Sequence, residues 1–485
     1  MKRYELLKFI IFISYLLVIE SSILAKDDLI VVNKKVDEQT DHFIRNIFFD
    51  WENEPFNVFN QVKNKTHCAI DLGAGIGTTS IWLSKNFHHV VAIEPDVKSL
   101  VCLRKNLKAS KCSNILICDR PISKTNMQVI FGPRGANLNE MSSHVKCEIS
   151  NENDYHIQAM SFKQLVYDYI YSNDAINAHR ISFINCNIEG GEEDILEDVL
   201  HFAYNNNCVV FMSFHLDLWR NKNITEYEYL FQHFKTNCPV ENICEYLIAH
   251  PFASLVFKPL KDRGVLVKKN IPVFVIGYNQ YTFIKNIVKQ LEKYTSDITV
   301  IDNNSGFQPL LDYYKNEYRY TLLKQKINYG HNVYSQKFIQ RLAGDLYVLT
   351  DPDLQFNPML PDNFMEDMID ISNHYRANKV GFALLIDSDD IRTDVTFSGH
   401  TIKEWESRFW VDRLYYPAKP KLELYRAAID TTFCLINRKF NDPSIRVAGD
   451  FTCMHIPWHQ NFQKNLEKGE SESYMKNNIS SYWFK

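Results

Sequence analysis

The stretch AIDLGAGIGTTS, residues Ala69–Ser80, decides the fold of the first half of the chain. An apolar run ends at Asp71, and three glycines follow at alternate positions: Gly73, Gly75 and Gly77. Glycine lets the chain turn tightly and lets a ligand approach the backbone, while the first turn of a helix offers unsatisfied N–H groups. The stretch therefore predicts a strand, a tight turn and a helix, with a nucleotide-like ligand at the turn.

Strand-like runs alternate with helical patterns on both sides of this turn. In the first half the runs HCAIDLGAG, HVVAIEP and NILICDR alternate with TTSIWLSKNF and DVKSLVCLRKNLKAS. The alternation restarts after Asn270 with IPVFVIGYN, YTFIKNIVKQLEKYT and DITVIDNNS, and it reaches a further strand, LYVLT. This spacing predicts parallel sheets with right-handed crossovers, so both halves are expected to be α/β.

The charged connector KPLKDRGVLVKKN separates the two halves. We therefore predict one domain over residues 26–260, a second over residues 270–460 and a C-terminal tail over residues 461–485. A length of 485 residues suits two or three domains, each with its own core. The net charge of -4 gives no basic excess, so nucleic acid is not expected as a partner.

The N-terminus has a targeting pattern. Lys2 and Arg3 precede the apolar stretch LLKFIIFISYLLVIESSILA, which predicts a secretory signal peptide or a signal anchor over residues 1–25. A buried N-terminal helix is the third alternative. The expected location is the secretory pathway, in the Golgi or ER lumen, with membrane anchoring through this segment if it is not cleaved. A cytoplasmic location is the alternative, and the eleven cysteines, without a Cys-x-x-Cys pair, do not decide it.

Two acidic residues accompany the glycine turn. A glycine pattern alone also suits a dinucleotide site, but the Asp71 charge would repel a pyrophosphate. A carboxylate at this position can hold the ammonium group, or the ordered waters, of an amino-acid moiety. Glu94 ends the next strand, in VVAIEPD, where it can accept hydrogen bonds from both hydroxyls of a ribose.

The motifs DLGAGIGTTS and AIEPD resemble those of the Rossmann-like S-adenosylmethionine-dependent methyltransferases, and FINCNIEGGEEDIL is similar to the strand-turn signature of the FkbM-type group. The resemblance covers roughly residues 64–214. It implies a Rossmann-like sheet that binds S-adenosylmethionine through the acidic and glycine residues just described, namely Asp71, Gly73, Gly75, Gly77 and Glu94.

One residue departs from the FkbM-type signature, which has an aspartate where this chain has Asn187. Asparagine carries no titratable carboxylate and cannot act as a general base. Glu189 is then the predicted acid/base residue, with Glu192 and His215 as further candidates. The alternative for the two glutamates is a solvated helix start, where carboxylates are favourable, and for the histidine it is a structural role.

In the second half, the stretch YVLTDPDLQF places Asp351 and Asp353 directly behind a strand, on either side of Pro352. Asp-Pro-Asp is common in ordinary turns. Carboxylates at alternate positions can also hold a hard cation, Mn²⁺ or Mg²⁺, together with a diphosphate leaving group. Upstream, Asp302 ends another strand in VIDNNS, where it could bind a nucleotide base or ribose.

The segments IPVFVIGYNQYTFIKNIV, TVIDNNS, YVLTDPDL, WESRFW and IRVAGDFTCMHIPW together resemble a GT-A-type glycosyltransferase of the family-2-like branch, over about residues 271–458. This resemblance implies a nucleotide-sugar donor and a glycan acceptor. It also implies that Asp351 and Asp353 lie at the metal-diphosphate site, that Asp302 lies by the nucleotide, and that His455 is a further metal ligand. A histidine satisfied in the core is the alternative for His455.

Sugar transfer with inversion needs a base that deprotonates the acceptor hydroxyl. Asp430, in AAIDTTF, is favoured slightly over Glu406, in EWESRFW, and Glu404 is a weaker candidate. The alternative for these residues is a structural carboxylate.

Three hypotheses follow. The first is a bifunctional glycan-modifying enzyme that transfers a sugar from a nucleotide-sugar donor and a methyl group from S-adenosylmethionine to a hydroxyl. The second is a glycosyltransferase with an inactive methyltransferase-like domain, which Asn187 motivates. The third is a non-enzymatic carbohydrate-binding or interaction protein, because a fold alone does not give a function.

Overall fold

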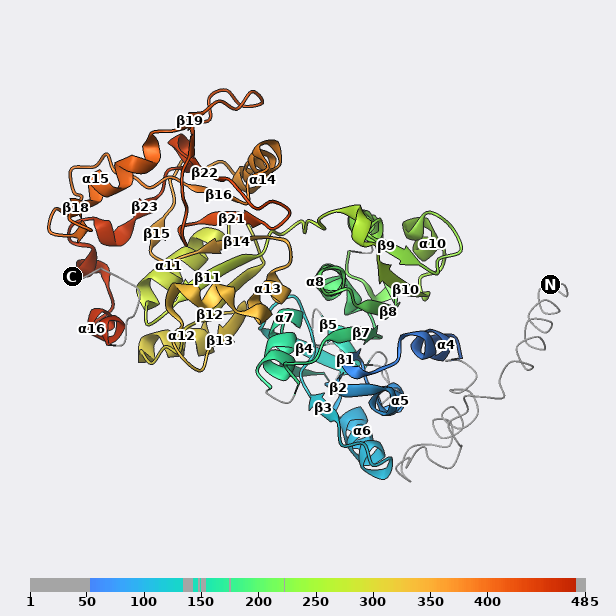
Figure 1. Ribbon diagram of the computed structural model, residues 1–485. Coiled ribbons are helices and arrows are strands. Elements are labelled where there is room, and N and C mark those ends of the chain that lie inside the picture. The colour runs from blue at the N-terminus through green and yellow to red at the C-terminus, as the bar shows by residue number, and fades with distance from the viewer. Residues whose placement is uncertain are drawn as a thin grey trace.

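A computed structural model describes residues 53–133, 143–146, 149, 154–173, 176–221 and 223–476. The predicted signal segment, residues 1–25, lies outside the described residues, as does the end of the predicted tail. Within the described part of the chain, no helix combines the length and the apolar character that a membrane crossing requires. The chain forms two α/β units, each built on its own sheet (Figure 1).

The first unit contains a seven-stranded sheet in the order β3-β2-β1-β7-β8-β10-β9. All neighbouring pairs are parallel except those that involve β10, which is antiparallel to β8 and to β9. The strands are β1 (Asn64–Leu72), β2 (Phe87–Ile93), β3 (Ile115–Cys118), β7 (Ile181–Cys186), β8 (Val209–Ser213), β9 (Phe234–Thr236) and β10 (Ser254–Pro259). The chain order reverses between β1 and β7, and ligands bind at such a switch point, outside the carboxyl ends of the strands.

Helices and a small sheet complete the first unit. The central strands are buried on both faces and therefore carry nearly continuous apolar sequence, such as CAIDL in β1. The helices are α4 (Asn53–Val62), α5 (Thr78–Asn86), α6 (Val97–Ala109), α7 (Phe162–Val166), α8 (Glu192–Asn206), α9 (Glu228–Phe231) and α10 (Ile243–Ala249). The small antiparallel sheet consists of β4 (Gln128–Pro133), β5 (Ser143–Lys146) and β6 (Tyr155–Gln158).

The second unit contains a nine-stranded mixed sheet in the order β13-β12-β11-β14-β21-β16-β22-β20-β19. Its first four strands in this order are parallel, and β21 is antiparallel to both of its neighbours. The strands are β11 (Val273–Gly277), β12 (Ile298–Asp302), β13 (Thr321–Lys324), β14 (Leu346–Thr350), β16 (Lys379–Phe382), β19 (Arg413–Leu414), β20 (Leu424–Arg426), β21 (Cys434–Asn437) and β22 (Ser444–Val447).

The helices of the second unit are α11 (Tyr281–Leu291), α12 (Gln308–Asn316), α13 (Lys337–Ala343), α14 (Phe364–Tyr375), α15 (Ile402–Ser407) and α16 (Glu470–Met475). Two short antiparallel pairs are separate from the main sheet: β15 (Leu354–Gln355) with β23 (Met454–His455), and β17 (Thr396–Phe397) with β18 (His400–Thr401). The last helix, α16, contacts α11, because the buried Glu470 accepts hydrogen bonds from the backbone N–H and the hydroxyl of Thr282.

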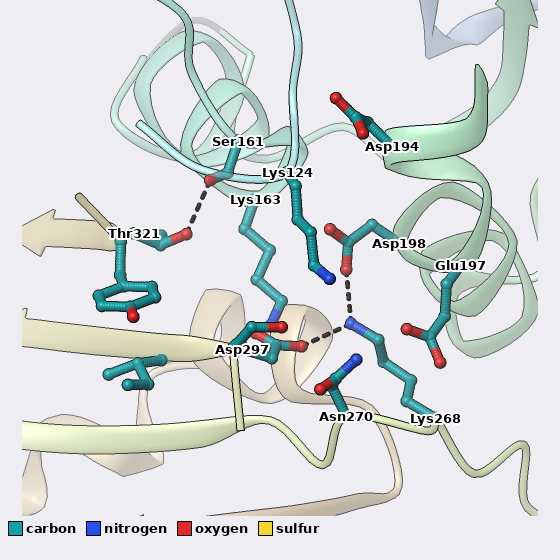
Figure 2. Close-up of a pocket in the computed structure, with 13 residues that line it drawn as sticks. Lys124, Ser161, Lys163, Asp194, Glu197, Asp198, Lys268, Asn270, Asp297 and Thr321 are labelled. Carbon is teal, nitrogen blue, oxygen red and sulfur yellow. Dashed lines mark hydrogen bonds and ion pairs between the residues drawn. The ribbon is translucent and has the colours of Figure 1, made fainter. Parts of the chain in front are cut away.

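The two units share one apolar core. Phe162 and Leu200 from the first unit belong to the same buried cluster as Phe274 and Leu342 from the second. Polar contacts reinforce this junction, including a hydrogen bond of 2.7 Å between the hydroxyls of Ser161 and Thr321 (Figure 2). The units are therefore held together by packed side chains and not only by the connecting segment.

A small cavity, partly open to solvent, lies at this junction (Figure 2). Buried charges line it. Lys268 contacts Asp198 and Asp297 at 2.5 Å each, and Lys163 makes an ion pair with the same Asp297. Burial acts to raise the pKa of Asp297, but the charges of Lys163 and Lys268 outweigh it and lower that pKa. The aspartate is therefore ionised and bridges two lysines across the junction.

The prediction of an α/β fold is confirmed by both sheets. In the first unit, the expected strand, glycine turn and helix are β1, residues 73–77 and α5. The GT-A type of the second unit stays a prediction at this point.

Candidate functional sites

The glycine loop lies at the switch point of the first sheet. Gly73, Gly75 and Gly77 all have positive φ, at 83°, 53° and 100°. A Cβ atom on Gly73 would lie 1.8 Å from the carbonyl oxygen of Asn187, so only glycine lets β1 meet the turn after β7. Within the described part of the chain, no atom lies within 4 Å of the corresponding position on Gly75. The middle of the loop therefore faces open space, where a ligand can approach the backbone.

Asp71, at the end of β1, is fully buried and faces protein groups. Its carboxylate accepts hydrogen bonds from the Ser80 hydroxyl at 2.5 Å and from the Asn185 amide at 2.7 Å. Burial raises the pKa of Asp71. These contacts join β1, α5 and β7, so Asp71 organises the loop from within. Its direct contact with a ligand stays a prediction.

Glu94 lies at the end of β2, beside the loop. Its carboxylate accepts hydrogen bonds from the backbone N–H groups of Gly75 at 2.7 Å and Asp96 at 2.8 Å. Only 6% of the residue is exposed, and burial raises the pKa of Glu94 to about 8. Each oxygen can accept a second hydrogen bond, so the carboxylate remains able to accept from ribose hydroxyls.

The FkbM-like turn lies next to the loop, between β7 and α8. Asn187 is exposed, and its backbone N–H donates to the carbonyl of Leu72 at 2.9 Å, which fixes the turn on β1. Glu189 has a positive φ of 52°, which is uncommon for a residue other than glycine. One oxygen of Glu189 lies 3.8 Å from Nε2 of His215.

Glu192, in contrast, is fully buried at the start of α8. Its carboxylate accepts a hydrogen bond from Nδ1 of His215 at 2.9 Å. Sequence analysis identified both glutamates and this histidine as separate acid/base candidates, and the fold brings the three side chains together. A solvated helix start does not describe Glu192.

In the second unit, the pairing of β15 with β23 places Leu354 opposite His455. As a result Asp353, one residue before β15, lies with its carboxylate 3.7 Å from Nε2 of His455. Both residues are largely buried. Burial lowers the pKa of His455, although the charges of Asp353 and Asp430 oppose this shift.

Asp351 lies at the carboxyl end of β14. Its backbone N–H donates to the carbonyl of Thr431 at 2.9 Å, and its carboxylate accepts from the Thr431 hydroxyl at 2.6 Å. Burial, with the charges of Asp353 and Asp430, raises the pKa of Asp351 well above its usual value. The structure therefore concentrates three carboxylates and one histidine at this edge of the sheet.

Asp430 and Glu406, the two predicted bases, lie in different surroundings. Burial acts to raise the pKa of Asp430, but hydrogen bonds from Thr432 outweigh it, with help from the charges of Arg446 and His455, so that pKa is lowered. Glu406 forms a buried ion pair with Arg446, and burial raises its pKa to about 7. Asp430 belongs to the cluster of Asp351, whereas Glu406 has an oxygen committed to Arg446.

The remaining predicted site residue, Asp302, ends β12 and is 2% exposed. It lies opposite Gly277 of β11 and Lys324 of β13 in the parallel register, and burial raises its pKa. Its predicted contact with a nucleotide stays a prediction. The weaker base candidate, Glu404, is exposed and closes a capping box with Thr401 at the start of α15.

Among the described residues, no group of three or more His, Cys, Asp and Glu side chains is placed to hold a metal ion. Asp351, Asp353 and His455 are therefore not preassembled as a ligand set. The ten cysteines in the described part of the chain are all free thiols.

Sequence reasoning missed the partners that give these residues their environments. Asn185 contacts Asp71 across 114 positions of sequence, Thr431 contacts Asp351 across 80, and Arg446 contacts Glu406 across 40. No local pattern marks such pairs. Phe252 was also missed; it is 53% exposed, and its ring centroid lies 6.1 Å from that of His215.

No family model and no curated protein matches the sequence. Among solved structures, the chain is similar to the methyltransferase FkbM from Methylobacillus flagellatus, at 12% identity and a TM-score of 0.27, over 48% of this chain and 56% of that one. It is similar to an rRNA methylase from Streptococcus thermophilus, at 10% identity and a TM-score of 0.26, over 43% of this chain and 95% of that one. M. jannaschii TYW2 in complex with AdoMet matches at 13% identity and a TM-score of 0.25, over 45% of this chain and 80% of that one.

The first two of these structural neighbours are named as a methyltransferase and an rRNA methylase, and the three matches cover 43% to 48% of the chain. Likeness at this level of identity and TM-score does not establish a shared function. The functional proposal below therefore rests on the strand order and on the side chains at the switch point.

Proposed function

We propose that the first unit binds S-adenosylmethionine and transfers its methyl group to a hydroxyl of an acceptor. One observation carries the proposal: the open space at Gly75, at the carboxyl edge of the sheet, lies directly beside the buried carboxylate of Glu94. A backbone that a ligand can approach and an acceptor for ribose hydroxyls therefore adjoin each other.

The residues at this edge suit the cofactor. The N-terminus of α5 follows the loop at once, with Gly77 as its N-cap. Glu94 would accept hydrogen bonds from the ribose, and the backbone at Gly75 would lie against the ligand. The bound cofactor supplies an electrophilic methyl group, so the protein has to align an acceptor oxygen with it and receive a proton.

Binding of S-adenosylmethionine to the whole chain, measured by isothermal titration calorimetry, tests this proposal. Gly75→Leu should weaken binding at least tenfold, because the side chain would occupy the open space. Gly306→Leu is the matched control, since Gly306 also has nothing within 4 Å of its Cβ position but lies in the second unit. Wild-type protein that binds no S-adenosylmethionine, or Gly75→Leu protein that binds it normally, would contradict the proposal.

We propose glycosyl transfer as the function of the second unit. The observation that favours it is the buried cluster of Asp351, Asp353, Asp430 and His455 at the carboxyl edge of β14. Carboxylates gathered in a buried site suit a divalent cation with oxygen ligands, and Nδ1 of His455 has no hydrogen-bond partner within the described residues. Asp351, Asp353 and His455 would hold Mn²⁺ or Mg²⁺ after side-chain rearrangement.

In this proposal a cation held by these residues would supply positive charge for the diphosphate of a nucleotide-sugar donor. Asp430 takes the proton from a hydroxyl of the glycan acceptor, and Asp302 contacts the nucleotide. A mixed sheet with parallel strands β11 to β14 provides the edge on which these groups gather.

Nucleoside diphosphate release from a panel of nucleotide sugars, with and without Mn²⁺, tests the second function. Asp351→Asn and Asp353→Asn should abolish the metal-dependent release, whereas Asp362→Asn, at an exposed aspartate on the same unit, should not change it. Full turnover in both site variants would exclude the proposed metal site.

The two proposals together describe a bifunctional glycan-modifying enzyme. The alternative, a glycosyltransferase with an inactive methyltransferase-like unit, predicts sugar transfer without any methylated product. A carbohydrate-binding protein would show neither reaction.

A further inference from the structure

The backbone that bears His215 is held in place by hydrogen bonds, at the same edge of the sheet as the proposed methyl-transfer site. His215 follows β8, whose neighbour β7 adjoins β1. The backbone on either side of it is fixed, because Phe214 donates to the carbonyl of Ala253 and Leu216 donates to that of Pro251, both at 2.9 Å. The imidazole is thus presented by a rigid segment at the carboxyl edge of the sheet.

Two close backbone contacts connect this segment to the glycine loop. A Cβ atom on Gly73 would meet the carbonyl of Asn187, and a Cβ atom on Gly190 would meet Leu218 at 2.6 Å. The turn after β7 is therefore in contact with the glycine loop on one side and with the segment of His215 on the other. A ligand at Gly75 and an acceptor at His215 would lie on neighbouring loops of one edge.

The hydrogen bonds of Glu192 determine which nitrogen of His215 carries the proton. This buried carboxylate accepts from the backbone N–H of Gly190 at 2.9 Å and from the indole N–H of Trp219 at 3.2 Å, and both groups can only donate. The Glu192 oxygen that contacts Nδ1 of His215 also accepts a hydrogen bond from the backbone N–H of Ile188 at 3.3 Å. Nδ1 therefore carries the hydrogen, and Nε2 of the neutral ring keeps its lone pair.

On the other side of the ring, a carboxylate oxygen of Glu189 lies 3.8 Å from Nε2, which is too long for a direct hydrogen bond. The exposed ring of Phe252 lies on the same histidine, edge to face. Glu189, from the turn, and Glu192, from α8, are the two carboxylates of the described residues whose ion-pair distances to the imidazole are 3.8 and 2.9 Å.

We propose that His215 is the general base of the methyl transfer and that Glu192 is its positioning residue, so that Asn187 needs no carboxylate. The inference rests on the proposed methyltransferase function. A lone pair of the acceptor oxygen forms the new bond to the methyl carbon, and the electron pair of the breaking carbon–sulfur bond stays on sulfur. The hydroxyl proton moves to Nε2 of His215, and the Glu189 carboxylate stabilises the imidazolium that forms.

Nuclear magnetic resonance of the full chain with ¹⁵N-labelled histidine tests the geometry without any substrate. Long-range correlations, assigned to His215 through the missing signal in His215→Gln, should show hydrogen on Nδ1 and an unprotonated Nε2 in the neutral ring. Glu192→Gln should lose this preference, and Asp217→Asn, which changes an exposed neighbour on the same segment, should keep it. Hydrogen on Nε2 in the wild type, or an unchanged tautomer in Glu192→Gln, would overturn the proposal.

The second measurement follows S-adenosylhomocysteine release with methyl glycosides of common hexoses as acceptors. His215→Gln should lower kcat by about 10²- to 10⁴-fold, the usual contribution of general-base catalysis, while calorimetry shows unchanged binding of S-adenosylmethionine. Undiminished turnover in His215→Gln would overturn the role of the histidine. A wild type that does not bind S-adenosylmethionine would remove the methyltransferase function itself, a result that is independent of the tautomer.

Discussion

The backbone N–H of Gly75 donates a hydrogen bond of 2.7 Å to the carboxylate of Glu94. The contact joins the glycine loop after β1 to the end of β2, and it buries an acid whose pKa rises to about 8 through loss of solvent. The proposed cofactor site thus contains a carboxylate that is difficult to ionise while the site has no ligand.

Glu94→Gln is expected to change how stability depends on pH. Because the folded-state pKa of Glu94 lies above the unfolded value of about 4.3, the unfolded chain releases this proton first as pH rises. Wild-type protein should lose free energy of unfolding relative to the variant between about pH 4.5 and pH 8, and no further above that range. Urea unfolding at several pH values measures the difference, and a constant difference would contradict the expectation.

Gly73 and Gly75 should respond differently to alanine. At Gly75 the new methyl group meets no atom of the described residues, and the left-handed backbone conformation opposes the substitution by about 1 kcal/mol. At Gly73 the new methyl group overlaps the Asn187 carbonyl as well, and we expect a loss of about 3 kcal/mol or more. Chemical denaturation of the two variants provides the comparison, and equal losses would be inconsistent with the close approach of the two loops.

Asp71→Ala should destabilise the first unit even when no ligand is present. The Ser80 hydroxyl and the Asn185 amide would lose their acceptor in a buried site, which costs about 1–3 kcal/mol. Asp217→Asn, at an exposed aspartate, should stay within about 0.5 kcal/mol of wild type. Unfolding curves without ligand separate this structural effect from a binding effect.

Lys268→Met should weaken the junction between the units. It leaves Asp198 and Asp297 without their shared cation, and we expect a loss on the order of 3 kcal/mol. Lys269→Met removes an exposed pair with Glu226 and should cost under about 1 kcal/mol. Since the folded-state pKa of Asp297 is lowered, its contribution is present above about pH 4 and is lost as the pH falls below that value. Differential scanning calorimetry at pH 7 and pH 3 should therefore give a smaller difference at the lower pH.

Asp353→Asn should stabilise the second unit when no divalent cation is present. Burial and the charge of Asp353 raise the pKa of Asp351. Removing the charge of Asp353 should therefore increase the free energy of unfolding by about 1 kcal/mol at pH 7. Added Mn²⁺ should raise the Tm of wild type but not that of the variant, because a cation that binds only the folded state stabilises it. Equal Mn²⁺ effects on the two proteins would argue against the metal site.

Much of the first unit could be predicted from local sequence. The run CAIDL becomes β1 because it is apolar and bounded by glycines, and the three glycines take up the positive φ values that the turn requires. Glu94 was identified because the end of a parallel strand brings its side chain to the binding edge of the sheet.

The chemistry of individual site residues could not be predicted in this way. Glu406 was a candidate base in the sequence, yet β22 brings Arg446 against it and commits it to an ion pair. Glu192 suited a solvated helix start, yet it is fully buried and contacts His215 and Trp219. Each of these partners lies more than 20 positions away.

The sequence by itself determined where strands, turns and helices lie and which residues end on the binding edges, because hydrophobic period and glycine placement act within a few residues. Only the tertiary structure decided which donor each carboxylate meets: Asn185 for Asp71, His215 for Glu192 and Thr431 for Asp351. Burial and hydrogen bonding set the charge and the proton position of these groups, and both depend on side chains that only the folded sheets bring into contact.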